Sequence, residues 1–117
     1  ALCGDDFHIW SGNDDQVVPM MSLGAKGVVS VAANLVPEVM VQMSHLCLEG
    51  RFREAAALQI KYTDLIDALF LEVNPIPIKA AMNLMGMEAG SLRLPLCDIS
   101  HKNLETLRQA MGRMGLL

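Results

Sequence analysis

Two short apolar segments, each followed by a helical pattern, limit the possible folds more than any other feature of this sequence. Residues 7–11 (FHIWS) precede the polar loop 12–15 (GNDD), and residues 27–31 (GVVSV) are rich in β-branched side chains. Both segments are too short for helices and are typical of strands. Strands that alternate with helices predict a parallel pair with a right-handed crossover, and therefore an α/β fold.

A parallel pair of strands leaves both of its edges unpaired, and two strands alone do not make a stable sheet. We therefore predict that neighbouring strands are supplied from elsewhere, by a missing part of the same protein or by another chain. The composition agrees, because 52% of the residues are hydrophobic and only 19% are charged. Open strand edges and apolar helix stripes predict self-association into at least a dimer.

The remaining sequence has helical periodicity interrupted by proline and glycine. Pro19 and Pro37 suit the first turn of a helix, Gly24 and Gly50 suit the end of one, and Ser100 is the expected N-cap of the last helix. The predicted helices cover residues 19–23, 37–50, 52–71, 77–85 and the stretch that follows Ser100.

Charge and hydropathy argue against two classes of partner. The formal net charge is −4 and lysine and arginine form no run, so a nucleic-acid partner or an anionic membrane surface is not expected. Lys26 and Glu38 interrupt the longest apolar stretch, which is too short to span a bilayer. The first ten residues have no basic region followed by an apolar one and do not resemble a signal peptide.

Cysteine and histidine positions predict neither disulfides nor a metal site. The three cysteines are odd in number and show no C-x-x-C spacing, which is typical of reduced thiols in a cytoplasmic protein. No histidine has the spacing to another ligand that metal sites use, so no metal or other cofactor is expected. These residues are Cys3, Cys47, Cys97, His8, His45 and His101.

Five strings carry a resemblance that covers nearly the whole chain. They are SGND (11–14), GAKGVVSV (24–31), AN (33–34), NPIPIK (74–79) and LRLPL (92–96). In this order and spacing they resemble the C-terminal part of the 4-hydroxy-tetrahydrodipicolinate synthases, a family of pyruvate-dependent class I aldolase-type lyases. NPIPIK with LRLPL is the most specific part, whereas GAKGVVSV is shared with N-acetylneuraminate lyases.

The resemblance implies the C-terminal portion of a (β/α)8 TIM barrel. Residues 1–50 would be the last two βα units, and residues 51–117 would be a helical C-terminal extension. Enzymes of this family bind pyruvate as a Schiff base on a barrel lysine and condense it with aspartate semialdehyde, in the biosynthesis of lysine and diaminopimelate. They need no cofactor and are usually homotetramers.

The family's Schiff-base lysine lies near the end of the sixth strand in a G-x-K-type string, and nothing in this sequence matches that string. The family's proton-relaying tyrosine, paired threonines and substrate-binding arginine also have no counterpart here. A Schiff-base lysine must be desolvated to react as a neutral amine, and none of the four lysines lies in such a pattern. We therefore expect no catalytic residue in this chain, and no turnover by the chain alone.

Active sites of barrel enzymes form at the C-terminal ends of the strands, which makes Gly12, Asn13 and Val29 the candidate substrate-binding residues. The resemblance implies that the backbone of the Gly12–Asn13 turn contacts the second substrate and that the Val29 carbonyl contacts pyruvate. The residues by themselves leave simpler alternatives open. These are an ordinary turn in which Asp14 or Asp15 caps the next helix, and a valine that only packs in the core.

Two other functions remain open at this point. An N-acetylneuraminate lyase or a keto-deoxy sugar acid aldolase would more often carry an acidic pair after the loop glycine, which Asn13 and Asp14 match only by half. A non-catalytic fragment that folds by self-association is the alternative of a different class. The string NPIPIK favours the dipicolinate synthases over the sugar-acid lyases.

Overall fold

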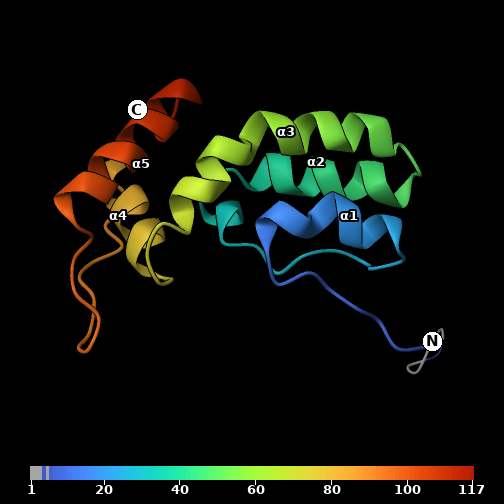
Figure 1. Ribbon diagram of the computed structural model, residues 1–117, viewed down its shortest axis with the longest axis horizontal. Helices are drawn as coiled ribbons and strands as arrows, with labels where there is room; N and C mark the ends of the chain where they lie inside the picture. The colour runs from blue at the N-terminus through green and yellow to red at the C-terminus, as the bar shows by residue number, and fades with distance from the viewer. Residues whose placement is uncertain (1–3, 5) are drawn as a thin grey trace. The chain divides into compact units, whose positions relative to one another are not determined.

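A computed structural model describes residue 4 and residues 6–117, so Cys3 lies outside the described residues. The described part contains five α-helices and two single-turn 3-10 helices, η1 and η2 (Figure 1). In chain order they are η1 Asp14–Gln16, α1 Val17–Ser22, η2 Ala32–Asn34, α2 Pro37–Leu48, α3 Phe52–Leu69, α4 Ile76–Leu84 and α5 His101–Arg113. None of the described helices is long and apolar enough to cross a membrane.

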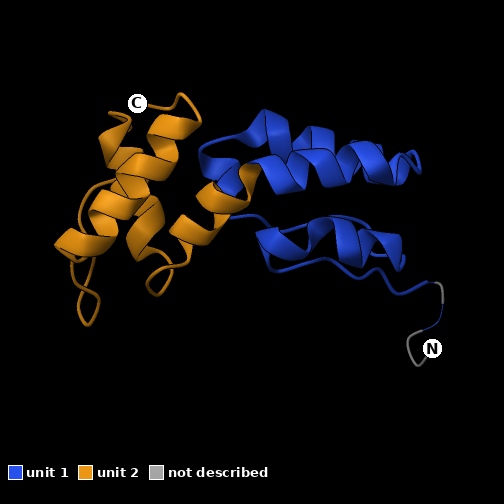
Figure 2. Cartoon of the chain, turned by 45° about the horizontal axis from the view of Figure 1, so that its top comes forward, with its two compact units in different colours: residues 1–61 blue, residues 62–117 orange. Residues whose placement is uncertain are grey.

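The chain divides into two compact units, residues 1–61 and residues 62–117 (Figure 2). In the first unit α1 and η2 both pack against α2. In the second unit α4 packs against α5. Helix α3 is continuous from the first unit into the second.

The two predicted strands are the main correction to the sequence analysis. No strand is assigned in residues 6–117, and residues 7–11 and 27–31 share only an isolated parallel bridge between Ser11 and Val28. The predicted direction is right, since the amides of Ser11 and Val29 donate to Gly27 and Ser11 over 2.8 and 2.9 Å. The full ladder is missing because a parallel pair needs flanking strands, which the described residues do not provide.

The predicted helices all form, with ends shifted by a few residues. α1 begins at Val17, two residues before the expected start, because the first three amides of a helix have no partner and Pro19 therefore fits the third position. α2 begins at Pro37, and Gly50 ends it in the left-handed conformation with φ of +76°. Buried side chains on α2 recur every three to four residues, as expected for a helix with one face in the core; they are Met40, Met43, Leu46 and Cys47.

In the second unit α4 and α5 pack against each other through buried side chains. Leu107 and Met111 are fully buried on this helix, and Ile76, Ile78 and Ala81 are buried on α4. Ser100 stands at the N-cap of α5, but its side chain forms no cap hydrogen bond. Its hydroxyl donates to Glu72 over 2.7 Å instead, so the expected side-chain cap is wrong.

Candidate functional site

The structure brings the three candidate residues to one end of the extended pair. Gly12 and Asn13 directly follow Ser11, the residue whose carbonyl accepts the amide of Val29. Gly12 and Asn13 are exposed, and 73% of Val29 is exposed, so Val29 is not a core residue in this chain. A Cβ added at Gly12 would meet no atom within 4 Å, which leaves open space beside the turn.

The Gly12–Asn13 turn is fixed by Ser11, which is fully buried. The Ser11 hydroxyl donates to the Asn13 carbonyl over 2.8 Å and accepts the Asn13 amide at 3.2 Å. These two bonds close the loop on itself. The exposed backbone of Gly12 is thereby held in one place without help from a neighbouring strand.

Asp14 is a residue of the site region whose role the sequence analysis missed. It caps neither η1 nor α1; its Oδ2 accepts the amides of Val31 and Ala32 over 3.0 and 2.9 Å. Gln59 of α3 is the second such residue, because its amide nitrogen donates to the Asp14 carbonyl over 3.0 Å. No local signal in the sequence points to these bonds, since their partners lie 17 to 45 residues apart.

The structure describes all four lysines of the chain. Lys26, Lys61 and Lys102 are exposed, and Lys79 is half-buried with its amine donating to the carbonyl of Ser91 over 2.6 Å. A Schiff-base lysine is desolvated, and none of these four side chains is buried. That this chain holds no Schiff-base lysine stays a prediction.

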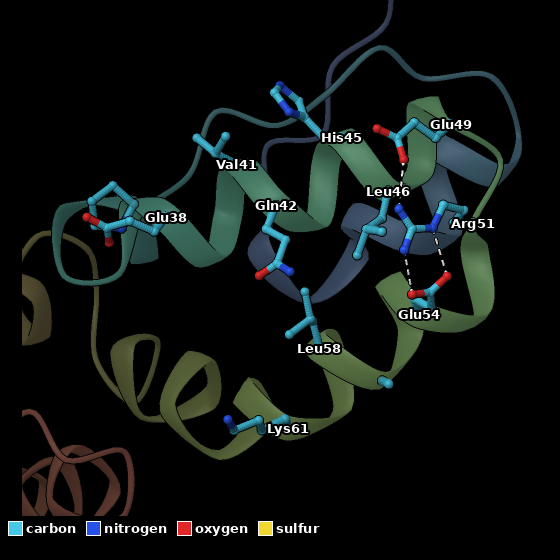
Figure 3. Close-up of a pocket in the computed structure, with 12 residues that line it drawn as sticks. Glu38, Val41, Gln42, His45, Leu46, Glu49, Arg51, Glu54, Leu58 and Lys61 are labelled. Carbon is cyan, nitrogen blue, oxygen red and sulfur yellow. Dashed lines mark hydrogen bonds and ion pairs between the residues drawn. The ribbon is translucent and has the colours of Figure 1, made fainter.

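A groove of about 870 Å³ lies between α2 and α3 (Figure 3). Gly12, Asn13 and Val29 are not among the residues that line it. Arg51 binds Glu54 through two hydrogen bonds of 2.8 and 2.7 Å and reaches Glu49 over 3.0 Å. The bonds from Arg51 hold the pKa of Glu54 below its ordinary value. Lys61, on the same helix as Glu54, is exposed, so the groove carries surface charges and no buried lysine.

Metal and thiol chemistry find no support among the described residues. No group of three or more His, Cys, Asp or Glu side chains in this part of the chain is arranged to hold a metal ion. Cys47 and Cys97 are free thiols, the first buried and the second exposed. Burial raises the pKa of Cys47, which keeps it protonated and unreactive at neutral pH.

Comparison with known proteins identifies the family. The profile of the Dihydrodipicolinate synthetase family matches residues 1–113. The 4-hydroxy-tetrahydrodipicolinate synthase of Clostridium novyi is 54% identical over 111 residues, which are 95% of this chain and 38% of that protein. That of Acetivibrio thermocellus is 50% identical over all 117 residues and 40% of its own length.

Solved structures agree in fold. The dihydrodipicolinate synthase of Thermotoga maritima is 42% identical and superposes with a TM-score of 0.93 over 97% of this chain and 39% of that one. The enzyme from Acinetobacter baumannii, solved in complex with pyruvate, is 34% identical with a TM-score of 0.90 over 95% of this chain and 38% of that one. The chain thus has part of the TIM-barrel fold of these enzymes and spans about two fifths of the length of the curated relatives. With a family profile matched over nearly all its residues, the chain belongs to the dihydrodipicolinate synthetase family.

Proposed function

We propose that this chain is the C-terminal part of a 4-hydroxy-tetrahydrodipicolinate synthase, a cytoplasmic lyase that condenses pyruvate with aspartate semialdehyde through a Schiff base in lysine and diaminopimelate biosynthesis. The observation that carries the proposal is the 54% identity, over 95% of the chain, to a relative of that name. The pyruvate complex of the Acinetobacter baumannii enzyme supports pyruvate as one substrate.

In this proposal residues 1–50 are the last two βα units of the barrel and residues 51–117 are its helical extension. The parallel bridge between Ser11 and Val28 supports the assignment, because each bridged segment is followed by a helix, as in a barrel. The stretch from α3 to α5, in which every assigned regular element is a helix, supports the extension. In the complete barrel, further strands would pair with the two open edges.

Gly12, Asn13 and Val29 are then the residues that contact substrate through their backbone. Their support is position: they share the C-terminal end of the parallel pair, where barrel active sites form, and all three are exposed. The open space beside Gly12 would accommodate the second substrate. Val29 would place its carbonyl at pyruvate, with the side chain acting only as a wall.

Self-association is part of the proposal. Phe7, Ile9 and Trp10 on the first extended segment are between 48% and 62% exposed, and the adjoining segment exposes Val29. Such apolar surface on an open strand edge favours association with another chain. Sedimentation of the isolated chain should give at least a dimer, and a monodisperse monomer would contradict this point.

A chimaeric enzyme tests the function. The chain should replace the matching C-terminal region of the Clostridium novyi synthase, to which it is 54% identical. We expect the chimaera to condense pyruvate with aspartate semialdehyde and to trap pyruvate covalently when treated with borohydride. A folded chimaera that traps no pyruvate, or traps it without forming product, would contradict the proposal.

Two controls separate the alternatives. A second chimaera on the N-terminal part of an N-acetylneuraminate lyase should be inactive, and a higher activity there than in the first chimaera would favour the sugar-acid lyases. The isolated chain, treated with pyruvate and borohydride, should keep its mass, because its lysines are exposed or half-buried. A mass increase on any lysine would overturn the expectation that this chain alone forms no Schiff base with pyruvate.

A further inference from the structure

Asp14 connects the two loops that carry the candidate site. It follows Gly12 and Asn13 directly, and its carboxylate accepts the amides of Val31 and Ala32, at the end of the second extended segment. The side chain is 1% exposed. One buried carboxylate thus links the turn proposed for the second substrate to the segment proposed for pyruvate.

Gln59 fixes the backbone of Asp14 from the other side. Its amide nitrogen donates to the Asp14 carbonyl over 3.0 Å, and its amide oxygen accepts the backbone amide of Val18 over 3.0 Å. Gln59 belongs to α3, which lies outside both loops. The carboxylate and the carbonyl of Asp14 are therefore held by separate parts of the chain.

The arrangement is costly, which argues that it has a purpose. No ion pair with the Asp14 carboxylate is found among the described residues, and its Oδ1 is buried without a hydrogen-bond partner. Burying a polar oxygen without a partner destabilises a fold, and an apolar side chain would avoid that cost. What Asp14 adds is a side-chain oxygen that accepts two backbone amides at once.

We infer that Asp14 is a positioning residue that holds the Gly12–Asn13 turn and the Val29 carbonyl at a fixed separation, with Gln59 as its support. The inference rests on the proposed function for what the two loops bind. Asp14 acts through the backbone and touches no substrate. Because a misplacement of about 1 Å can reduce a rate by about 100-fold, a loosened link should show in catalysis before it shows in folding.

Amide hydrogen exchange in the isolated chain tests the link without any activity. Asp14→Ala should speed exchange at Val31 and Ala32 by about tenfold or more, because it removes the buried acceptor of both amides. Asp14→Asn keeps an acceptor oxygen and should give a smaller increase. Asp15→Asn is the matched control, because Asp15 is exposed, and should change nothing. Unchanged exchange in both Asp14 variants would overturn the inference.

The chimaera tests the positioning role. Asp14→Asn should lower kcat/KM, per site that traps pyruvate with borohydride, by about tenfold, and Gln59→Met should lower it less; Asp15→Asn should leave it unchanged. A merely structural role would reduce the number of trapping sites and leave kcat/KM per site unchanged, which would overturn the inference. An inactive parent chimaera would contradict the proposed function instead, while the exchange measurement still decides whether Asp14 links the loops.

Discussion

Residues 1–61 and residues 62–117 each use a carboxylate to hold backbone amides at the start of a helix, but in different surroundings. In the first unit Asp14 is buried and accepts the amides of Val31 and Ala32 at η2. In the second unit Glu72 is half-buried and accepts the amide and hydroxyl of Ser100 at the start of α5. The same chemistry therefore connects two site loops in one unit and fastens a helix start near the surface in the other.

The difference extends to the backbone of each unit. In the second unit the main elements are helices, whose amides bond to carbonyls a turn away and need no outside partner. In the first unit, among the described residues, the backbone–backbone hydrogen bonds between the two extended stretches are those donated by the amides of Ser11, Lys26 and Val29. The comparison teaches that the second unit relies on packed helices, whereas the first unit adds to its helical core an extended pair whose hydrogen bonds join residues far apart in the sequence.

Truncating a buried side chain in the core of the second unit should have the largest effect on stability. Leu107 is fully buried on α5, and Leu107→Ala should lower the free energy of unfolding by about 2–5 kcal/mol. Hydrogen exchange should accelerate in α4 and α5, because those helices pack on each other. Urea unfolding together with residue-resolved exchange measures both effects.

A matched control is Leu94→Ala, since Leu94 is 91% exposed and the change should stay within about 0.5 kcal/mol. The amides of Ser11 and Val29 report on the first unit. If their exchange accelerates as much as that of α5 in the Leu107 variant, the two units do not differ in the source of their stability and the comparison fails.

A smaller effect is expected at the end of α2, in the first unit. Gly50 has φ of +76°, its amide donates to Cys47, and the next amide, of Arg51, donates to Leu46. A side chain there is forced into the left-handed region, so Gly50→Ala should cost about 1–2 kcal/mol in urea unfolding. Gly12→Ala should cost almost nothing, because Gly12 lacks a positive φ and a Cβ meets open space. If Gly50→Ala and Gly12→Ala lower the free energy of unfolding equally, the left-handed conformation of Gly50 does not stabilise the end of α2.

Local signals in the sequence were enough to predict the helices. Proline in the first turn, glycine at the end and apolar residues every three to four positions all act within one helix, as Pro37 and Gly50 do for α2. The strands were not predictable in the same way. Residues 7–11 and 27–31 have the composition of strands, but a ladder also requires neighbours, and the described residues supply only one bridge.

The candidate site was only partly predictable, because some of its contacts also join residues that lie far apart in the sequence. The family resemblance pointed to Gly12, Asn13 and Val29, and the structure places them at one end of the extended pair; their contact with substrate stays a prediction. For Asp14 the sequence suggests a helix cap or half of an acidic pair, and neither points to the partners that it has. Its true partners lie 17 and 18 residues away, and no periodicity or capping rule connects such positions.

The smallest effect should come from Glu72, the half-buried counterpart of Asp14. Hydrogen bonds from the side chain and amide of Ser100, and then from Asn103, hold the pKa of Glu72 below its ordinary value of 4.5. A lowered pKa means that the fold favours the ionised form, so the stabilisation is complete above pH 4.5 and is lost as pH falls through the lower value in the folded chain. Glu72→Gln should therefore lower the urea midpoint slightly at pH 7 and flatten its fall below pH 4.5. If the urea midpoint falls equally steeply below pH 4.5 in the unchanged chain and in Glu72→Gln, the acid sensitivity arises from another group. The comparison of Glu72 with Asp14 then fails.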